Sequence, residues 1–202
     1  MVCELLPDQA EAHGLAALLL HSAARSAARR DPEGRFVPLG EQDITLWSRD
    51  SIEAAEAHLT TALSLRSLGP YQLMGAIQSV HNRRAATGST DWLAIRQLYD
   101  GLVVLEPSVG VQVARAAAVL EADGANAALT CLDGLDERRT STYQPYWVVR
   151  GEALGREGRP SAAAARRALD LTTDPSVARH LQQRFDLTTP SDGGHAPDDR
   201  SS

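Results

Sequence analysis

Lysine is absent from this chain, because all 20 of its basic residues are arginine. A Schiff-base lysine, a catalytic lysine and the lysine of a phosphate-binding loop are therefore excluded. Aromatic residues make up only 4% of the sequence, so alanine and leucine must supply most of the core, which suits closely packed helices. The longest apolar run near the N-terminus, residues 15–20, is much too short to span a bilayer.

Cysteine is scarce as well. Cys3 and Cys131 are far apart and have no ligand-like neighbours in the sequence. We therefore expect neither a disulfide framework nor a zinc site, and a reducing compartment is the natural environment. Acidic residues and Pro7 precede any apolar run, unlike a secretory signal. Together these features predict a cytoplasmic protein. Its net charge of −6 argues against direct binding to a nucleic-acid backbone.

Helical spacing of apolar residues dominates the chain, and strand-like alternation is nearly absent. A first helix is predicted over about residues 8–30, with Pro7 in its first turn. Asp50 and Glu53 have the spacing of a capping box and open a second helix that ends near residue 67. The expected buried stripe of that helix is Ile52, Ala55, Leu59 and Leu63.

Turn and capping signals divide the rest of the chain into further helices. They are Gly69-Pro70, Thr90-Asp91, Pro107-Ser108, Gly124, Gly158-Arg159-Pro160 and Asp174-Pro175. The prediction is an all-α fold of about nine helices, in antiparallel pairs that form a tetratricopeptide-like right-handed solenoid. Residues 1–87 form its N-terminal part, continuous with the repeats of residues 88–187. Residues 188–202 are rich in polar residues, proline and glycine and are predicted to be a disordered tail.

Short strings at consistent spacing give the chain a family resemblance. They are Leu6-Pro7-Asp8, Leu18-Leu19-Leu20-His21, Glu41-Gln42-Asp43 with Trp47, Gly69-Pro70-Tyr71-Gln72-Leu73, Thr90-Asp91-Trp92 and Leu98-Tyr99-Asp100. Together they resemble the C-terminal extension of the group of extracytoplasmic-function RNA polymerase sigma factors with a long, tetratricopeptide-like helical tail. The resemblance spans about residues 5–185. It departs from the family pattern at Ala114, where an asparagine is usual before the arginine.

The resemblance implies a regulatory protein–protein interaction module that modulates transcription initiation in bacteria. Its implied partners are the sigma-factor DNA-binding regions, RNA polymerase or a cognate regulatory protein. In the family, two DNA- and polymerase-binding regions precede this extension, and Met1 falls just before Leu5. We therefore expect the chain not to bind promoter DNA alone.

A basic helix face is the first candidate for partner binding. His21, Arg25 and Arg29 follow one another at four-residue spacing and share one side of a helix. One interpretation is a docking surface for an acidic partner. The alternative is a solvated face near a helix C-terminus, which favours cations.

A second set of candidates lies in a loop and along the following helices. Its members, which would line a concave groove, are Gln42, Asp43, Trp47, Tyr71, Gln72, His81, Asp91 and Trp92. The alternative is that Asp91 caps a helix while the aromatic residues anchor packing.

The sequence contains no zinc-protease helix, no glycine-rich nucleotide fingerprint and no serine elbow. We therefore expect a protein that is not an enzyme and needs no cofactor or metal. The alternative is a small-ligand sensor or an enzyme that uses a groove around Tyr71, His81 and Trp92.

Overall fold

The computed structural model describes residues 2–187, and in this range it is all-helical, which confirms the predicted all-α class. Nine of its α-helices have nine residues or more, as predicted. The helices are α1 (Val2–Leu5), α2 (Ala10–Ala24), α3 (Arg49–Ser64), α4 (Pro70–Asn82), α5 (Arg84–Thr87), α6 (Trp92–Leu105), α7 (Val109–Ala122), α8 (Ala125–Asp133), α9 (Glu137–Thr140), α10 (Gln144–Arg156), α11 (Ala162–Asp170) and α12 (Pro175–Arg184). The predicted tail, residues 188–202, lies outside the described residues. None of the described helices combines the length and apolarity needed to cross a bilayer.

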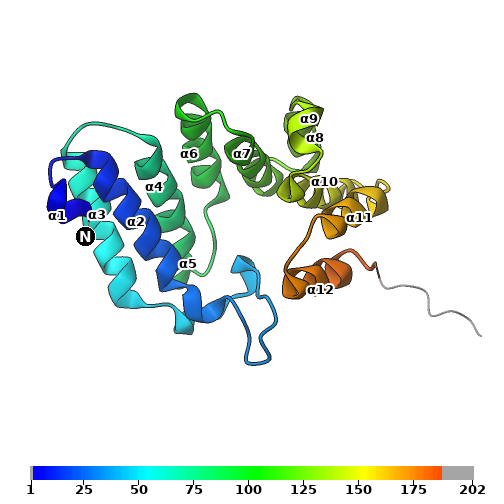
Figure 1. The fold of residues 1–202 in the computed structure, drawn as a ribbon, viewed down its shortest axis with the longest axis horizontal. Coiled ribbons are helices and arrows are strands. Elements are labelled where there is room, and N and C mark those ends of the chain that lie inside the picture. The colour runs from blue at the N-terminus through cyan, green and yellow to red at the C-terminus, as the bar shows by residue number, and fades with distance from the viewer. Residues whose placement is uncertain (1, 188–202) are drawn as a thin grey trace, which may run out of the picture.

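The helices follow one another along an arc (Figure 1). At one end, α2 packs against both α3 and α4, and α4 then contacts α6. From α6 onward each long helix packs on its neighbours in chain order through α7, α8, α10 and α11 to α12. Successive packing of this kind is typical of a helical repeat protein, in which neighbours share one continuous core.

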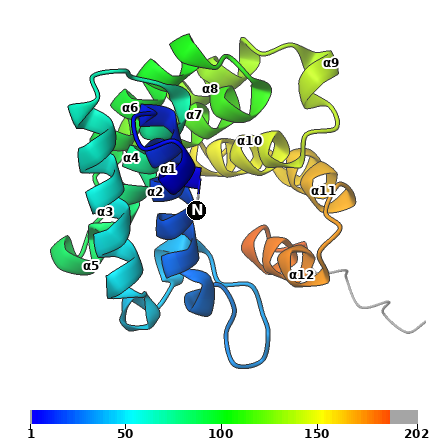
Figure 2. The same cartoon turned by 60° about the vertical axis from the view of Figure 1, so that its left-hand side comes forward.

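The two ends of the arc approach each other through the loop that follows α2 and the last helix, α12 (Figure 2). Arg30 forms an ion pair with Asp174, with 2.9 Å between Nη2 and Oδ2. The backbone N–H of Phe36 donates to Ser176 Oγ at 2.5 Å. The Phe36 ring also meets the His180 ring edge-on, with 5.5 Å between centroids. These contacts join segments about 140 residues apart in the chain.

Helix starts follow the predicted capping signals at most positions. Asp91, Ser108 and Asp174 each accept a hydrogen bond from a backbone N–H in the first turn of α6, α7 and α12. The predicted capping box of α3 is wrong, because Ser48 is its N-cap and accepts from the N–H of Ser51. Glu53 instead pairs with Arg49 on the helix surface.

The first long helix is shorter than predicted, because α2 ends at Ala24 and a 3₁₀ turn, η1 (Ser26–Ala28), follows. The carbonyl of Ala24 accepts the N–H of Ser48, at 2.9 Å, so the end of α2 is fastened to the start of α3. This contact uses a carbonyl that a longer helix would have used internally.

The buried stripe of α3 also differs from the prediction. Ala55 and Leu59 are buried as expected, and Ala62 joins them. Leu63, however, is 69% exposed and Ile52 is only half-buried. The reason is that α2 covers the side of α3 that carries the alanines, so the side that carries Ile52 and Leu63 remains open to solvent.

The contact between α2 and α4 depends on glycine. A Cβ added at Gly14 would lie 2.6 Å from the backbone nitrogen of Gln72 and 2.9 Å from the carbonyl carbon of Tyr71. Both are backbone atoms of α4, so no side-chain rotation relieves the clash. The close approach of the two helices therefore requires a residue without a side chain.

We predict that Gly14→Ala lowers the free energy of unfolding by about 2 kcal/mol, because overpacking outweighs the gain in helix propensity. Urea unfolding followed by circular dichroism measures the effect. Gly101→Ala in α6 is the matched control, since its Cβ would meet only Leu73 Cδ1 at 3.6 Å. It should stabilise the protein by up to about 1 kcal/mol. Equal effects of the two substitutions would contradict the prediction.

Candidate functional site

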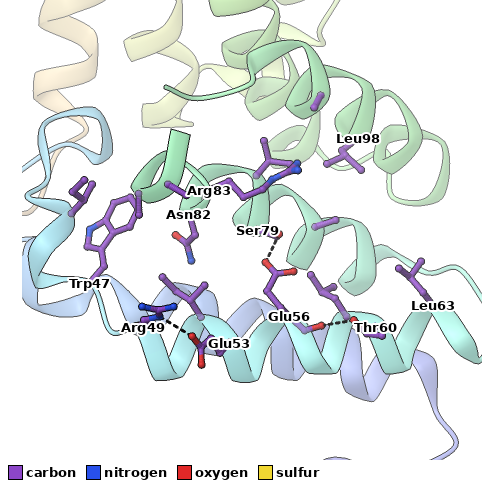
Figure 3. A pocket seen from close by; sticks show the side chains of 18 of the residues that line it. Trp47, Arg49, Glu53, Glu56, Thr60, Leu63, Ser79, Asn82, Arg83 and Leu98 are labelled. Carbon is purple, nitrogen blue, oxygen red and sulfur yellow. Dashed lines mark hydrogen bonds and ion pairs between the residues drawn. The ribbon is translucent and has the colours of Figure 1, made fainter. Parts of the chain in front are cut away.

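A groove of about 1080 Å³ runs along the open side of α3, between α3 and the opposing helices α4, α5 and α6. Its apolar lining includes Trp47, Ile52, Leu59, Leu63, Val80 and Leu98. Its polar lining includes Arg49, Glu53, Glu56, Ser79, Asn82 and Arg83. Side chains from α3 and from α4 face each other across the groove (Figure 3). We call this feature the α3 groove.

Glu56 is the polar centre of the α3 groove. Its Oε1 accepts a short hydrogen bond from Ser79 Oγ of α4. The same oxygen lies 3.5 Å from Nε2 of His21, which comes from α2 and is fully buried behind the groove. One carboxylate of α3 therefore faces both neighbouring helices.

A hydrogen bond from Asn82 determines which nitrogen of the His21 ring carries the proton. The side-chain N–H of Asn82 donates to His21 Nδ1 at 2.9 Å, so Nδ1 is an acceptor and the ring carries its proton on Nε2. Burial is the main cause of a lowered His21 pKa, with the Glu56 charge opposing it and the Arg25 charge adding to it. His21 is thus neutral near pH 7 and directs an N–H toward Glu56.

Arg25 extends the same buried cluster. Its guanidinium donates to Asn82 Oδ1 at 2.6 Å and to Gln78 Oε1 at 2.5 Å, both on α4. Burial and the nearby charge of Arg29 lower the pKa of Arg25 to about 10, so it remains a cation at neutral pH. We call the set of Arg25, Asn82, His21 and Glu56 the buried polar network, which reaches the surface at Glu56, whose side chain is 46% exposed in the groove.

The predicted basic docking face is wrong for two of its three members. His21 is 0% exposed and Arg25 is 7% exposed, because α4 covers this side of α2. Arg29 alone is exposed, and its Nη2 donates to the carbonyl and the hydroxyl of Ser22. Arg25 and His21 join α2 to α4, and the three residues present no shared surface to a partner.

The loop candidates have separate roles. Gln42 is buried, and its Nε2 donates to the carbonyl of Val37 at 3.2 Å. Asp43 caps a 3₁₀ turn, η3 (Ile44–Leu46), and hydrogen bonds from Thr45 lower its pKa. Trp47 is 7% exposed and is the one member of this trio that lines the α3 groove.

The structure does not bring Tyr71 to His81 and Trp92, so the predicted groove around these three residues does not form. Tyr71 and the buried Gln72 begin α4, where their backbone N–H groups donate to the Glu11 carboxylate. His81 ends the same helix and meets Trp92 edge-on at 5.4 Å. Trp92 lines a separate depression of about 440 Å³ that faces α7, α10 and α12. Asp91 caps α6, as its alternative interpretation predicts.

Sequence reasoning missed Glu56, Ser79 and Asn82, which form the polar centre of the site. No motif marks them, because they come from two helices and meet only when these pack together. A weaker signal existed on α3. Arg49, Glu53, Glu56 and Thr60 recur at helical spacing beside Ile52 and Leu63, which indicates a mixed polar and apolar face.

The arrangement favours binding over proton transfer. His21 presents an N–H rather than a lone pair to Glu56, and the Ser79 hydroxyl donates to the same carboxylate. Of the groups in these two contacts, only Glu56 could accept a proton from the Ser79 hydroxyl. A long apolar trough with charged residues at intervals suits the side of another helix. The described residues close enough together to hold a metal ion lie outside this groove.

Comparisons with known proteins assign the chain no activity. A family described as a family of unknown function (DUF6596) matches residues 1–63, which include α1, α2 and nearly all of α3. An uncharacterized protein of Rhizobium meliloti (strain 1021) is 39% identical over 188 residues, or 92% of this chain and 44% of the relative. The chain thus spans less than half the length of this relative. No solved structure matches the chain.

We predict that Asn82→Ala lowers the free energy of unfolding by about 3 kcal/mol. The substitution leaves the Arg25 cation and the His21 ring without their shared partner while both remain buried. Chemical unfolding measures the loss. Asn126→Ala, at an exposed position of α8, is the matched control and should change stability by less than about 0.5 kcal/mol. A loss below about 1 kcal/mol in Asn82→Ala would contradict the role of the buried polar network.

We also predict that acid destabilises the protein through His81. Burial, helped by the charge of Arg25, lowers the His81 pKa from 6.5 to about 4. Between these values the unfolded chain binds a proton that the folded chain does not, so the free energy of unfolding falls as pH drops from 6.5 to 4, by about 3 kcal/mol. Urea unfolding at several pH values tests this. His81→Leu should reduce the slope and leave the smaller contribution of His21, and an unchanged slope would refute the assignment.

Proposed function

We propose that this chain is a regulatory protein–protein interaction module that binds an amphipathic helix of its partner in the α3 groove. The observation that carries this proposal is the groove itself, which leaves Leu63 69% exposed beside half-buried Ile52 and Leu98. A row of apolar side chains along a helix favours a second helix that covers it.

The length of the groove suits such an occupant. Its lining runs from Trp47, just before α3, to Leu63 at the C-terminal end of this 16-residue helix. At a rise of 1.5 Å per residue the trough is about 24 Å long, which accommodates about four turns of a partner helix.

Charges along the groove would orient the partner. Arg49 and Glu53 pair on α3 at 2.8 Å and are mostly exposed, and Arg83 is exposed across the groove on the α4 side. Exposed charges at the edge of an interface contribute more to orientation and selectivity than to affinity. Leu63 is the most exposed large apolar residue of the lining, so covering it should contribute most to affinity.

The resemblance to sigma-factor extensions supports a specific setting. In this proposal the chain acts in the bacterial cytoplasm, modulates transcription initiation and contacts sigma-factor DNA-binding regions, RNA polymerase or a cognate regulatory protein. More than half of the curated relative lies outside the matched segment, which leaves room there for additional regions. The chain itself would neither bind promoter DNA, given its net charge of −6, nor catalyse a reaction.

The alternative of a small-ligand sensor or enzyme around Tyr71, His81 and Trp92 finds less support. Tyr71 begins α4 and His81 ends it, so the three side chains share no cavity. His81 is packed against the Trp92 ring and favours its neutral form, which suits a packing role.

We predict that Leu63→Glu weakens partner binding by roughly tenfold to a hundredfold, the loss expected when one buried leucine is replaced. The partners are purified DNA-binding regions of an extracytoplasmic-function sigma factor from the same organism, and core RNA polymerase. Isothermal titration calorimetry measures each affinity. Because Leu63 is exposed in the free chain, the variant should fold normally, which circular dichroism verifies.

Val104→Glu is the matched control, since Val104 is 81% exposed on α6 and does not line the groove. It should bind as the unsubstituted chain does. The absence of binding to either partner would refute the proposed setting. Equal loss in both variants would refute the groove as the binding surface.

A further inference from the structure

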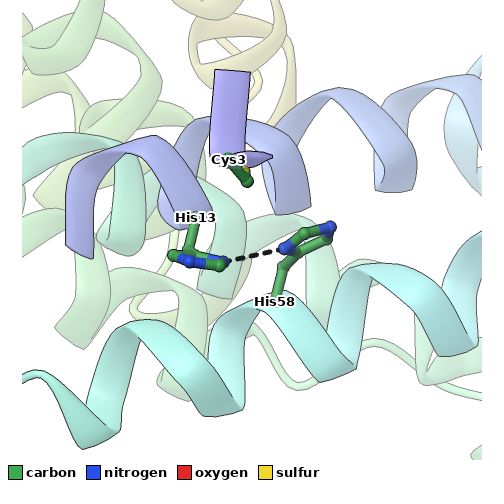
Figure 4. Close-up of side chains that lie close together, drawn as sticks. All are labelled: Cys3, His13 and His58. Carbon is green, nitrogen blue, oxygen red and sulfur yellow. Dashed lines mark hydrogen bonds between the residues drawn. The ribbon is translucent and has the colours of Figure 1, made fainter. Parts of the chain in front are cut away.

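Three side chains from three helices meet on the far side of α3 from Glu56. They are Cys3 of α1, His13 of α2 and His58 of α3 (Figure 4). One ligand atom from each lies within 4.8 Å of the other two. Cys3 and His13 are both 8% exposed, and His58 is half-buried. The cluster is separate from the α3 groove and has no part in the proposed partner binding.

The protonation of His13 prepares it as a ligand. Its Nε2 lies 3.0 Å from the carbonyl oxygen of Pro7, which only accepts hydrogen bonds, so Nε2 carries the proton. Its Nδ1 is therefore an acceptor and receives the Nδ1–H of His58 at 2.9 Å, a hydrogen bond that a bound metal ion would replace. A backbone carbonyl that fixes the outer N–H of a histidine is the usual support of a metal-ligating imidazole.

The distances are close to those of a tetrahedral zinc site. With Zn–N bonds of about 2.0–2.1 Å, two ligand nitrogens around zinc lie about 3.3 Å apart, and a sulfur and a nitrogen about 3.6 Å apart. To bind zinc, the two histidine nitrogens would move about 0.4 Å farther apart. The Cys3 sulfur would move at most about 1.2 Å closer to them. Small side-chain rotations provide such shifts. An apolar depression lined by Leu15, Leu19 and Leu20 adjoins Cys3.

We propose that Cys3, His13 and His58 form a binding site for a divalent transition-metal ion, with Zn²⁺ as the ion that the donor set fits. Zinc binds sulfur and imidazole nitrogen ligands such as these, whereas the hard ions Mg²⁺ and Ca²⁺ prefer oxygen ligands. The three protein ligands leave a fourth coordination position for water or another ligand. Binding displaces the thiol proton of Cys3, so the affinity rises with pH.

The site would give α1 a fixed position. This helix has only four residues, which is too few to be stable without support. One contact that holds α1 against α2 is a hydrogen bond from the Cys3 thiol to the carbonyl of Ala12, at 3.3 Å. Coordination would join α1 to α2 and α3 through bonds stronger than this hydrogen bond. The expectation from sequence that no zinc site exists missed this grouping, because its ligands are separated by 10 and 45 residues.

The test is a Zn²⁺ titration of the full chain against a chromophoric chelator, with the protein free of histidine tags. We expect one Zn²⁺ per chain and a Zn²⁺-dependent rise in the melting temperature. Cys3→Ser and His58→Gln should each weaken binding by at least a hundredfold, because each removes one of three ligands. Cys131→Ser and His180→Gln, which alter residues outside the cluster, should leave the affinity unchanged.

A second measurement distinguishes a real site from surface binding. Co²⁺ bound to the chain should show a sulfur-to-metal charge-transfer absorption that is lost in Cys3→Ser and retained in Cys131→Ser. Circular dichroism of the metal-free variants verifies that they fold. Failure of the unsubstituted chain to bind Zn²⁺ in a 1:1 ratio overturns the proposal, as does equal affinity in His58→Gln. Neither outcome bears on the α3 groove, which Leu63→Glu tests independently.

Discussion

A buried cation held by amide oxygens organises the N-terminal half of the molecule. Arg25 reaches from α2 to Asn82 and Gln78 on α4, and Asn82 continues to His21, whose ring faces Glu56 on α3. A guanidinium in the interior is tolerated only where its donors are satisfied, so these hydrogen bonds restrict how the three helices can pack. The α3 groove exists because this packing covers one side of α3 and leaves the other exposed.

The buried polar network and the α3 groove are therefore physically connected. Glu56 belongs to both, since it accepts from Ser79 within the groove and faces the buried His21 behind it. Any partner that lies along α3 would contact a surface whose polar centre is already fixed from within. Such preorganisation lowers the entropic cost of binding, because the side chains need not be ordered when the partner arrives.

The sequence was sufficient for the features that depend on local chemistry. Apolar spacing predicted the all-α class, and the caps at Asp91, Ser108 and Asp174 were found because a short polar side chain before an apolar run satisfies free N–H groups. Features that depend on helix packing were not predictable in this way. Periodicity cannot show whether a leucine such as Leu63 meets another helix or solvent. Nor can it show that α4 covers His21 and Arg25, or that Cys3 meets two distant histidines.

The closure of the arc has a consequence for its response to ionic strength. Arg30 and Asp174, which join the loop after α2 to α12, are each about half exposed. Mobile ions screen an exposed pair of this kind, whereas they hardly reach Arg25 in its interior setting. Rising salt thus loosens the junction between the two ends before it affects the three-helix layer. The contact between the loop after α2 and α12 is therefore the part of this fold whose strength depends on the ionic strength of the surrounding solution.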